Sequence, residues 1–236
     1  MAEYRKIALI GLDGSGKSAN INKMKKDIAY REYSFVWVRW QPKLLRPIYW
    51  LLEKKIKNSK ENFTEMFQKC QVQKLSNEQK KLNEEYNKKS GIKEKIFKNP
   101  IIRRVWMALA LIDYFFQFYY KTAIFLIKKD KIIFDRFYLD LFVDQGINFG
   151  YTPEKINKEV KKYQWLFPKM DKIIYLRVSP KACYNRKDDI PNMEYLFKRY
   201  EVYERLCKNP GWVIIDGESS FEKVNNNIKR EIFNSM

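Results

Sequence analysis

A glycine-rich motif near the N-terminus constrains this chain more than any other feature. Residues 11–18, GLDGSGKS, match the pattern G-x-x-x-x-G-K-S in full. An apolar run at residues 7–10 precedes the motif and a helical pattern follows it, which predicts a strand, a loop and a helix. Glycines let backbone N–H groups face a polyphosphate, and the helix N-terminus adds partial positive charge there. The motif therefore predicts a site for a nucleoside triphosphate.

Each part of this phosphate loop has an expected role. Lys17 is expected to reach the β- and γ-phosphates and to act in catalysis, and the Ser18 hydroxyl is expected to bind Mg²⁺. ATP and Mg²⁺ are therefore the expected cofactors. The backbone groups expected to surround the phosphates belong to Asp13, Gly14, Ser15, Gly16, Lys17 and Ser18.

A second motif, IIFDRF, ends another apolar run at residues 132–134. A protein with a phosphate loop needs a carboxylate at the end of a neighbouring strand to hold the water shell of the metal. Asp135 fits that position. Arg136 follows it and is expected to point beyond the γ-phosphate.

The remaining apolar runs indicate the fold class. Short apolar stretches at residues 35–38, 173–176 and 212–215 are separated by long helical patterns. Fully apolar strands that alternate with helices are typical of a parallel sheet covered on both faces. A length of 236 residues suits one α/β domain, here 1–236.

The composition excludes several kinds of chemistry. The chain has no histidine, so a Ser-His-Asp triad and an HExxH zinc site are both excluded. Its three cysteines show no CxxC spacing, which predicts a reduced, cytoplasmic location. Lys and Arg number 47 against 28 acids, for a net charge of +19. This charge would suit nucleic acid, anionic lipid or phosphorylated ligands equally well.

Taken together, the sequence resembles the thymidylate kinases, or the wider thymidylate kinase and deoxynucleoside kinase group of P-loop kinases. Four stretches carry the resemblance, which covers roughly residues 1–42 and 105–236: IALIGLDGSGKS, IIFDRF, KIIYLRVSPKACYNRK and WVIIDGESSFEKV. It implies a P-loop kinase fold with a five-stranded parallel sheet in the order 2-3-1-4-5 and helices on both faces, to which this chain adds a helical insertion. It also implies a small phosphate acceptor and a homodimer.

The resemblance assigns roles to particular residues. Asp13 would face the sugar hydroxyl of the acceptor, Arg136 would grip its phosphate, and Arg39 would lie near it. Arg186 would close over ATP from a lid at about residues 180–195. The implied catalytic residues are therefore Lys17, Arg136, Asp13 and Arg186.

The acceptor side departs from the family pattern. The Phe that stacks on thymine falls near Ala110, and the Arg that binds the acceptor phosphate falls on Tyr114. A Tyr that selects deoxyribose is replaced by Asp144. Gln145 is still expected to contact a base. Asp113 has two open interpretations, a residue lining the acceptor cleft or a polar residue on a helix face.

Two kinds of acceptor follow from this pattern. The first is a nucleoside monophosphate, as in thymidylate kinases. The alternative is a non-nucleotide acceptor, such as a sugar or a lipid-linked group. A nucleotide-binding regulatory protein fits less well, because the lid stretch and Asp13 would then have no purpose.

The Lys- and Asn-rich insertion at about 43–100 leaves several interpretations open. It would form a solvated helical hairpin that extends the lid or a dimer edge. Alternatively, residues 44–57, with Trp50 and basic flanks, would lie on a membrane surface. We favour burial of this apolar stripe against protein. Nucleic acid is not expected, since only the charge points to it.

Overall fold

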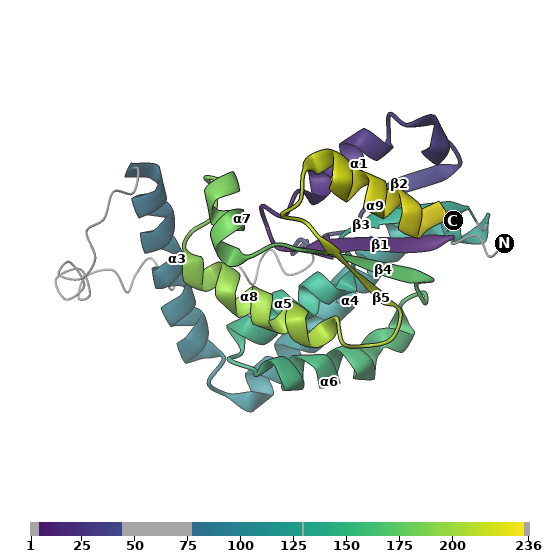
Figure 1. The fold of residues 1–236 in the computed structure, drawn as a ribbon. Helices are drawn as coiled ribbons and strands as arrows, with labels where there is room; N and C mark the ends of the chain where they lie inside the picture. Colours follow the sequence, from purple (N-terminus) through teal and green to yellow (C-terminus); the bar gives the residue numbers. More distant parts are fainter. Residues whose placement is uncertain (1–4, 44–76, 129, 234–236) are drawn as a thin grey trace.

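The central element is a five-stranded sheet in which every neighbouring pair is parallel. The computed structural model describes residues 5–43, 77–128 and 130–233. The strand order is β2-β3-β1-β4-β5, which confirms the predicted order 2-3-1-4-5 (Figure 1). The strands are β1 (Lys6–Gly11), β2 (Tyr33–Trp37), β3 (Lys131–Asp135), β4 (Lys172–Arg177) and β5 (Trp212–Asp216).

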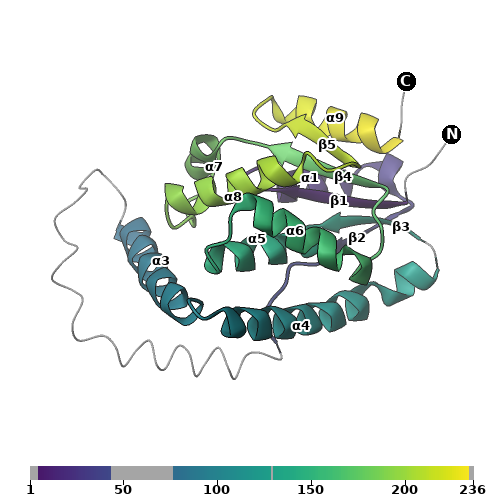
Figure 2. The same cartoon turned by 90° about the horizontal axis from the view of Figure 1, so that it is seen from below.

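The apolar strands are buried on both faces, as their sequences require. In β1, Ile7 and Leu9 belong to one core cluster, whereas Ala8 and Ile10 belong to the other. Helices α1 and α9 cover the first face, while α4, α5 and α8 cover the second (Figures 1 and 2). The helices are α1 (Lys17–Met24), α3 (Asn77–Ile96), α4 (Pro100–Ile127), α5 (Tyr138–Asn148), α6 (Pro153–Tyr163), α7 (Pro180–Arg186), α8 (Met193–Leu206) and α9 (Phe221–Phe233), with 3₁₀ turns at Ile28–Tyr30 and Gln164–Leu166.

The second strand begins and ends earlier than its apolar run. The run predicts a strand at 35–38, while β2 ends at Trp37. The backbone N–H of Val38 still donates to the carbonyl of Asp135, at 3.2 Å. Pairing therefore continues past the strand and carries the next residues toward the phosphate loop.

Helix α4 carries a stripe of polar residues, Asp113, Gln117 and Lys121, that faces the protein, while several of its apolar side chains face solvent. Asp113 is 1% exposed, while Phe116 is 61% and Tyr120 is 89% exposed. The Lys121 ammonium donates to the carbonyl of Trp37, at 3.2 Å. Within the described residues, no helix has the length and apolar character to cross a membrane.

The described end of the insertion is helical. In α3, Asn83 accepts a hydrogen bond from the Asn192 amide at 2.8 Å, and the Tyr86 ring contacts that of Tyr195 edge-on at 5.6 Å. Helix α3 therefore lies against the start of α8. The stripe at 44–57 lies outside the described residues, so its burial, the homodimer and the boundaries 43–100 and 180–195 stay predictions.

Candidate active site

The phosphate loop joins the end of β1 to α1, at the centre of the sheet. Gly14 and Gly16 have positive φ angles of 86° and 87°, which non-glycine residues rarely adopt. A Cβ on Gly14 would lie 2.5 Å from the carbonyl oxygen of Cys183. Glycine is therefore required for the loop conformation and for the close approach of α7.

The N-terminus of α1 is free to receive an anion. Gly16 occupies the N-cap position, and within the described structure no side chain caps this helix or places an acid in its first turn. In contrast, Asn99, Thr152 and Asn192 cap α4, α6 and α8 with side-chain oxygens. The unsatisfied N–H groups and the helix dipole of α1 therefore favour negative charge beside the loop.

Lys17 lies across the loop and is buried. Its Nζ donates to the carbonyls of Gly11 at 2.8 Å and Leu12 at 2.5 Å, and to the Ser15 hydroxyl at 3.2 Å. Burial and the nearby Arg136 guanidinium lower the pKa of Lys17 to about 8, although neighbouring carboxylates oppose them. This ammonium is well placed to exchange loop carbonyls for phosphate oxygens.

Arg136 forms the centre of a charged cluster beside the loop. It adopts a φ of 69° directly after β3, and its N–H donates to the Leu9 carbonyl at 3.1 Å. Its guanidinium forms ion pairs with Asp13 and, at 3.0 Å, with Asp140. Burial works to raise the pKa of Asp13, but Arg136 and Lys17 outweigh it and hold that pKa well below its usual value. Asp13 is therefore ionised at neutral pH.

Helix α8 supplies side chains that the sequence analysis did not identify. The Tyr195 hydroxyl donates to Asp13 at 2.8 Å, and the Tyr203 hydroxyl donates to Asp140 at 2.8 Å. Arg199 forms an ion pair with Asp144 at 2.6 Å. The three α8 residues are spaced by four, so they share one helix face. Two features of the sequence could have indicated these contacts. One is the four-residue spacing in α8, and the other is the position of Asp140 four residues after Arg136.

These side chains meet around one narrow pocket beside the loop. The pocket brings together three predicted site residues, Asp13, Arg39 and Arg136, with Gly11 and Leu12 at the end of β1. Side chains of α5 and α8 complete the lining, namely Asp140, Asp144, Tyr195, Arg199 and Tyr203.

Ser18 and Asp135 are the two residues predicted to hold a metal. Ser18 is exposed in the first turn of α1, and Asp135 ends β3. Burial raises the pKa of Asp135, against the opposing charges of Lys17 and Arg136. A hydroxyl and a carboxylate are oxygen donors of the kind Mg²⁺ prefers. Their chemistry therefore fits the predicted metal role.

Two residues predicted to contact the acceptor have partners inside the protein. The Asp113 carboxylate accepts hydrogen bonds from the Trp40 indole at 3.3 Å and the Lys43 N–H at 3.0 Å. The Gln145 side chain accepts from the Trp106 indole, at 2.9 Å. Neither residue lines the pocket beside the loop. Asp113 therefore anchors the segment after β2 to α4, and the acceptor role of both residues stays a prediction.

Three further residues discussed in the sequence analysis, Arg186, Ala110 and Tyr114, make contacts within the protein. Arg186, at the end of α7, donates to the Gly217 carbonyl at 3.0 Å and so links α7 to the loop after β5. Ala110 is fully buried, and the Tyr114 hydroxyl donates to the Val38 carbonyl at 2.9 Å. Ala110 therefore belongs to the core, and Tyr114 joins α4 to the segment after β2.

Comparison with known proteins supports the fold. No protein-family model matches the chain, and a search of curated protein sequences finds no match. Solved structures of deoxyadenosine kinase from M. mycoides, one with bound dCTP and one with dCMP and dCDP, match at 19% identity and a TM-score of 0.51. The alignments cover 98% of this chain and 100% of those chains. At this identity the likeness establishes a common fold: this chain has the fold of P-loop kinases.

Proposed function

We propose that this protein transfers the γ-phosphoryl group of ATP to a nucleoside monophosphate. The proposal depends on one observation: the lysine of the phosphate loop lies next to a pocket that is lined by two arginines. Lys17 belongs to a loop built for a polyphosphate, and Arg136 and Arg39 line the pocket directly beside it. Two anionic phosphates brought to these two sites would lie next to each other.

The residues divide the work of an in-line transfer. Such reactions need positioning and neutralisation of charge more than covalent chemistry. The N–H groups at the start of α1 hold the donor phosphates, and Lys17 neutralises the group that is transferred. Arg136, fixed by Asp13 and Asp140, orients the acceptor phosphate. Tyr195 of α8 closes the pocket and keeps water from competing as acceptor.

Mg²⁺ would be held by the Ser18 hydroxyl, the phosphate oxygens and, through water, Asp135. When bound, the metal would supply further neutralisation of phosphate charge. Arg186 would contact ATP on the α7 side of the loop. Its present bond to Gly217 fixes the guanidinium beside the loop that follows β5.

An unphosphorylated nucleoside is the second candidate acceptor. Three carboxylates, those of Asp13, Asp140 and Asp144, line the pocket, and an alcohol acceptor needs a base. The solved structures that match this chain are of a deoxyadenosine kinase, which points the same way. However, Arg136 depresses the pKa of Asp13, which makes this carboxylate a weak base. A phosphorylated acceptor needs no base, so we favour it.

A coupled ADP-release assay against a panel of acceptors tests the proposal. The panel contains nucleoside monophosphates, nucleosides and sugars, each with ATP and Mg²⁺. We expect turnover with at least one monophosphate and little with the matching nucleoside. Higher efficiency with the nucleoside would establish the second candidate, and activity confined to sugars would overturn both.

Thymidine monophosphate should be a poor substrate. The position of the stacking Phe is held by the buried Ala110, and Tyr114 is used to bond Val38. Loss of a base stack costs on the order of 1–3 kcal/mol. We therefore expect kcat/KM for dTMP below about 10⁴ M⁻¹s⁻¹, a typical lower bound for efficient enzymes. A higher value would show that this part of the alignment is displaced.

The efficiency with ATP should fall at alkaline pH. Lys17 has a pKa of about 8, so its ammonium form is lost as pH rises through that value. The profile of kcat/KM for ATP should be level near neutrality and then fall about tenfold per pH unit above the pKa. The Cys183 thiol, with a pKa of about 11, titrates too high to cause this fall. A level profile up to about pH 10 would contradict the role given to Lys17.

A further inference from the structure

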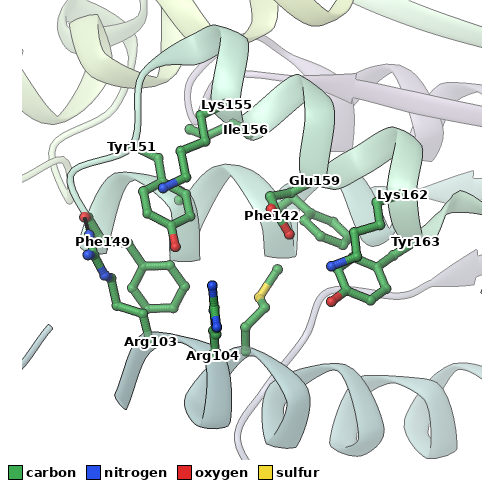
Figure 3. A pocket seen from close by; sticks show the side chains of 12 residues that line it. Arg103, Arg104, Phe142, Phe149, Tyr151, Lys155, Ile156, Glu159, Lys162 and Tyr163 are labelled. Atoms are coloured by element: carbon green, nitrogen blue, oxygen red, sulfur yellow. Dashed lines mark hydrogen bonds between the residues drawn. The ribbon is translucent and has the colours of Figure 1, made fainter. Parts of the chain in front are cut away.

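A second and larger cavity lies between α4, α5 and α6. Its volume is about 340 Å³, within the range of small-molecule sites (Figure 3). Phe142 and Gly146 of α5 line it, whereas Asp140 and Asp144, each two positions earlier, line the pocket beside the phosphate loop. Two positions turn a helix by about 200°, so the two pockets lie on opposite faces of α5.

Positive charge gathers around this cavity. Arg103 and Arg104 line it from α4, and Lys155 and Lys162 line it from α6, against one carboxylate, Glu159. None of the four cations forms an ion pair with a carboxylate in the described part of the chain. Figure 3 shows Arg104 rising from α4 toward the side chains of α6. The lining therefore favours an anion.

Arg103 is held at the wall of this cavity by two contacts. Its Nη1 donates to the carbonyl of Phe149 at 3.2 Å, and the guanidinium carbon lies 5.4 Å from the centre of the Tyr151 ring. Its Nε is buried and has no hydrogen-bond partner among the described residues. This atom is shielded from solvent, so Arg103 faces the cavity through other parts of its side chain.

Aromatic rings form the other walls. The rings of Phe142 and Tyr163 are nearly parallel, at 24°, with centroids 6.0 Å apart. The Lys155 ammonium lies 3.6 Å from the centroid of Tyr151, where it already contacts the ring face. Flat apolar walls beside cations suit a ligand that has both an aromatic ring and a negative group.

We propose that this cavity binds a small organic phosphate with a flat aromatic body, the chemistry that a nucleoside monophosphate presents. The phosphate would contact Arg104 and Lys155, and the ring would lie against the half-buried Tyr163, which the buried Phe142 supports from behind. The site is separate from the phosphate loop. The inference does not depend on the proposed kinase activity, because its test measures binding alone.

Calorimetric titration with AMP and with phenyl phosphate tests this site. The variant Arg104→Ala, Lys155→Ala removes two exposed cations of the lining, while Lys158→Ala, Lys161→Ala removes two exposed cations of α6 outside it. Charged hydrogen bonds contribute strongly, so we expect the first variant to weaken one binding step about 100-fold and the second to leave it unchanged. Glu159→Gln should strengthen the same step, because it removes the one carboxylate.

Three results would overturn the inference. The first is the absence of any binding step that responds to Arg104→Ala, Lys155→Ala in a variant whose thermal unfolding is unchanged. The second is equal loss of binding in the control variant, which would indicate a nonspecific charge effect. The third is inorganic phosphate binding as tightly as phenyl phosphate, which would show that an aromatic ring does not contribute to binding.

Discussion

Replacing Lys17 with alanine should abolish phosphoryl transfer while the fold persists. Its ammonium lies on the phosphate loop, where it bonds the carbonyls of Gly11 and Leu12 and contributes little to apolar packing. Loss of one preorganised charge on a reacting group typically lowers turnover by about 10²–10³-fold. The measurement is turnover with ATP and the preferred acceptor, alongside thermal unfolding.

A matched control is available on the surface. Lys26 is exposed and does not line either pocket, so Lys26→Ala should retain activity. Removal of a buried charge from Lys17 relieves desolvation, so its unfolding temperature should stay close to that of the native protein. A folded and fully active Lys17→Ala protein would refute the assignment of the phosphate loop.

Arg136→Met should lower both activity and stability. The guanidinium lies between Asp13 and Asp140, and its side chain is only 13% exposed. Removing it leaves two carboxylates without their ion-pair partner, and breaking a buried pair in this way costs about 3–5 kcal/mol. Turnover should also fall, because the acceptor phosphate loses its bidentate partner. Urea unfolding measures the change in free energy.

Two further variants separate folding from catalysis. Adding Asp13→Asn and Asp140→Asn to Arg136→Met removes the unpaired charges, so stability should recover while activity does not. Arg177→Met breaks the more exposed pair with Glu204 and should cost under about 1 kcal/mol. If Arg136→Met were no more destabilising than Arg177→Met, the buried cluster would not be the organising element of the pocket.

The sheet was predictable because its strands carry a simple signal. Short runs that are apolar throughout, such as those of β1 and β4, are typical of strands in a parallel sheet that is covered on both faces. The loop was predictable because glycines and a lysine at this spacing, directly after an apolar strand, are typical of a phosphate-binding loop. Arg136 was found for the same reason, since it directly follows a strand next to β1.

The pocket beside the phosphate loop was less predictable, because its contacts join distant parts of the chain. Tyr195 meets Asp13 across 182 positions, and its spacing from Arg199 also fits any amphipathic helix. For Asp113, periodicity showed a polar stripe but not which way it faces. The stripe faces inward because the segment after β2 carries polar groups that need partners. That segment has no repeating pattern from which its course could be derived.

The most direct test of the proposed kinase activity is the identity of the product. The protein would be incubated with ATP labelled in the γ-phosphate, Mg²⁺ and each nucleoside monophosphate, and the products would be separated and analysed by mass spectrometry. We predict that the native protein forms a labelled nucleoside diphosphate and that this product is absent with Lys17→Ala. Label found only in inorganic phosphate, or only in a product of an unphosphorylated acceptor, would contradict it.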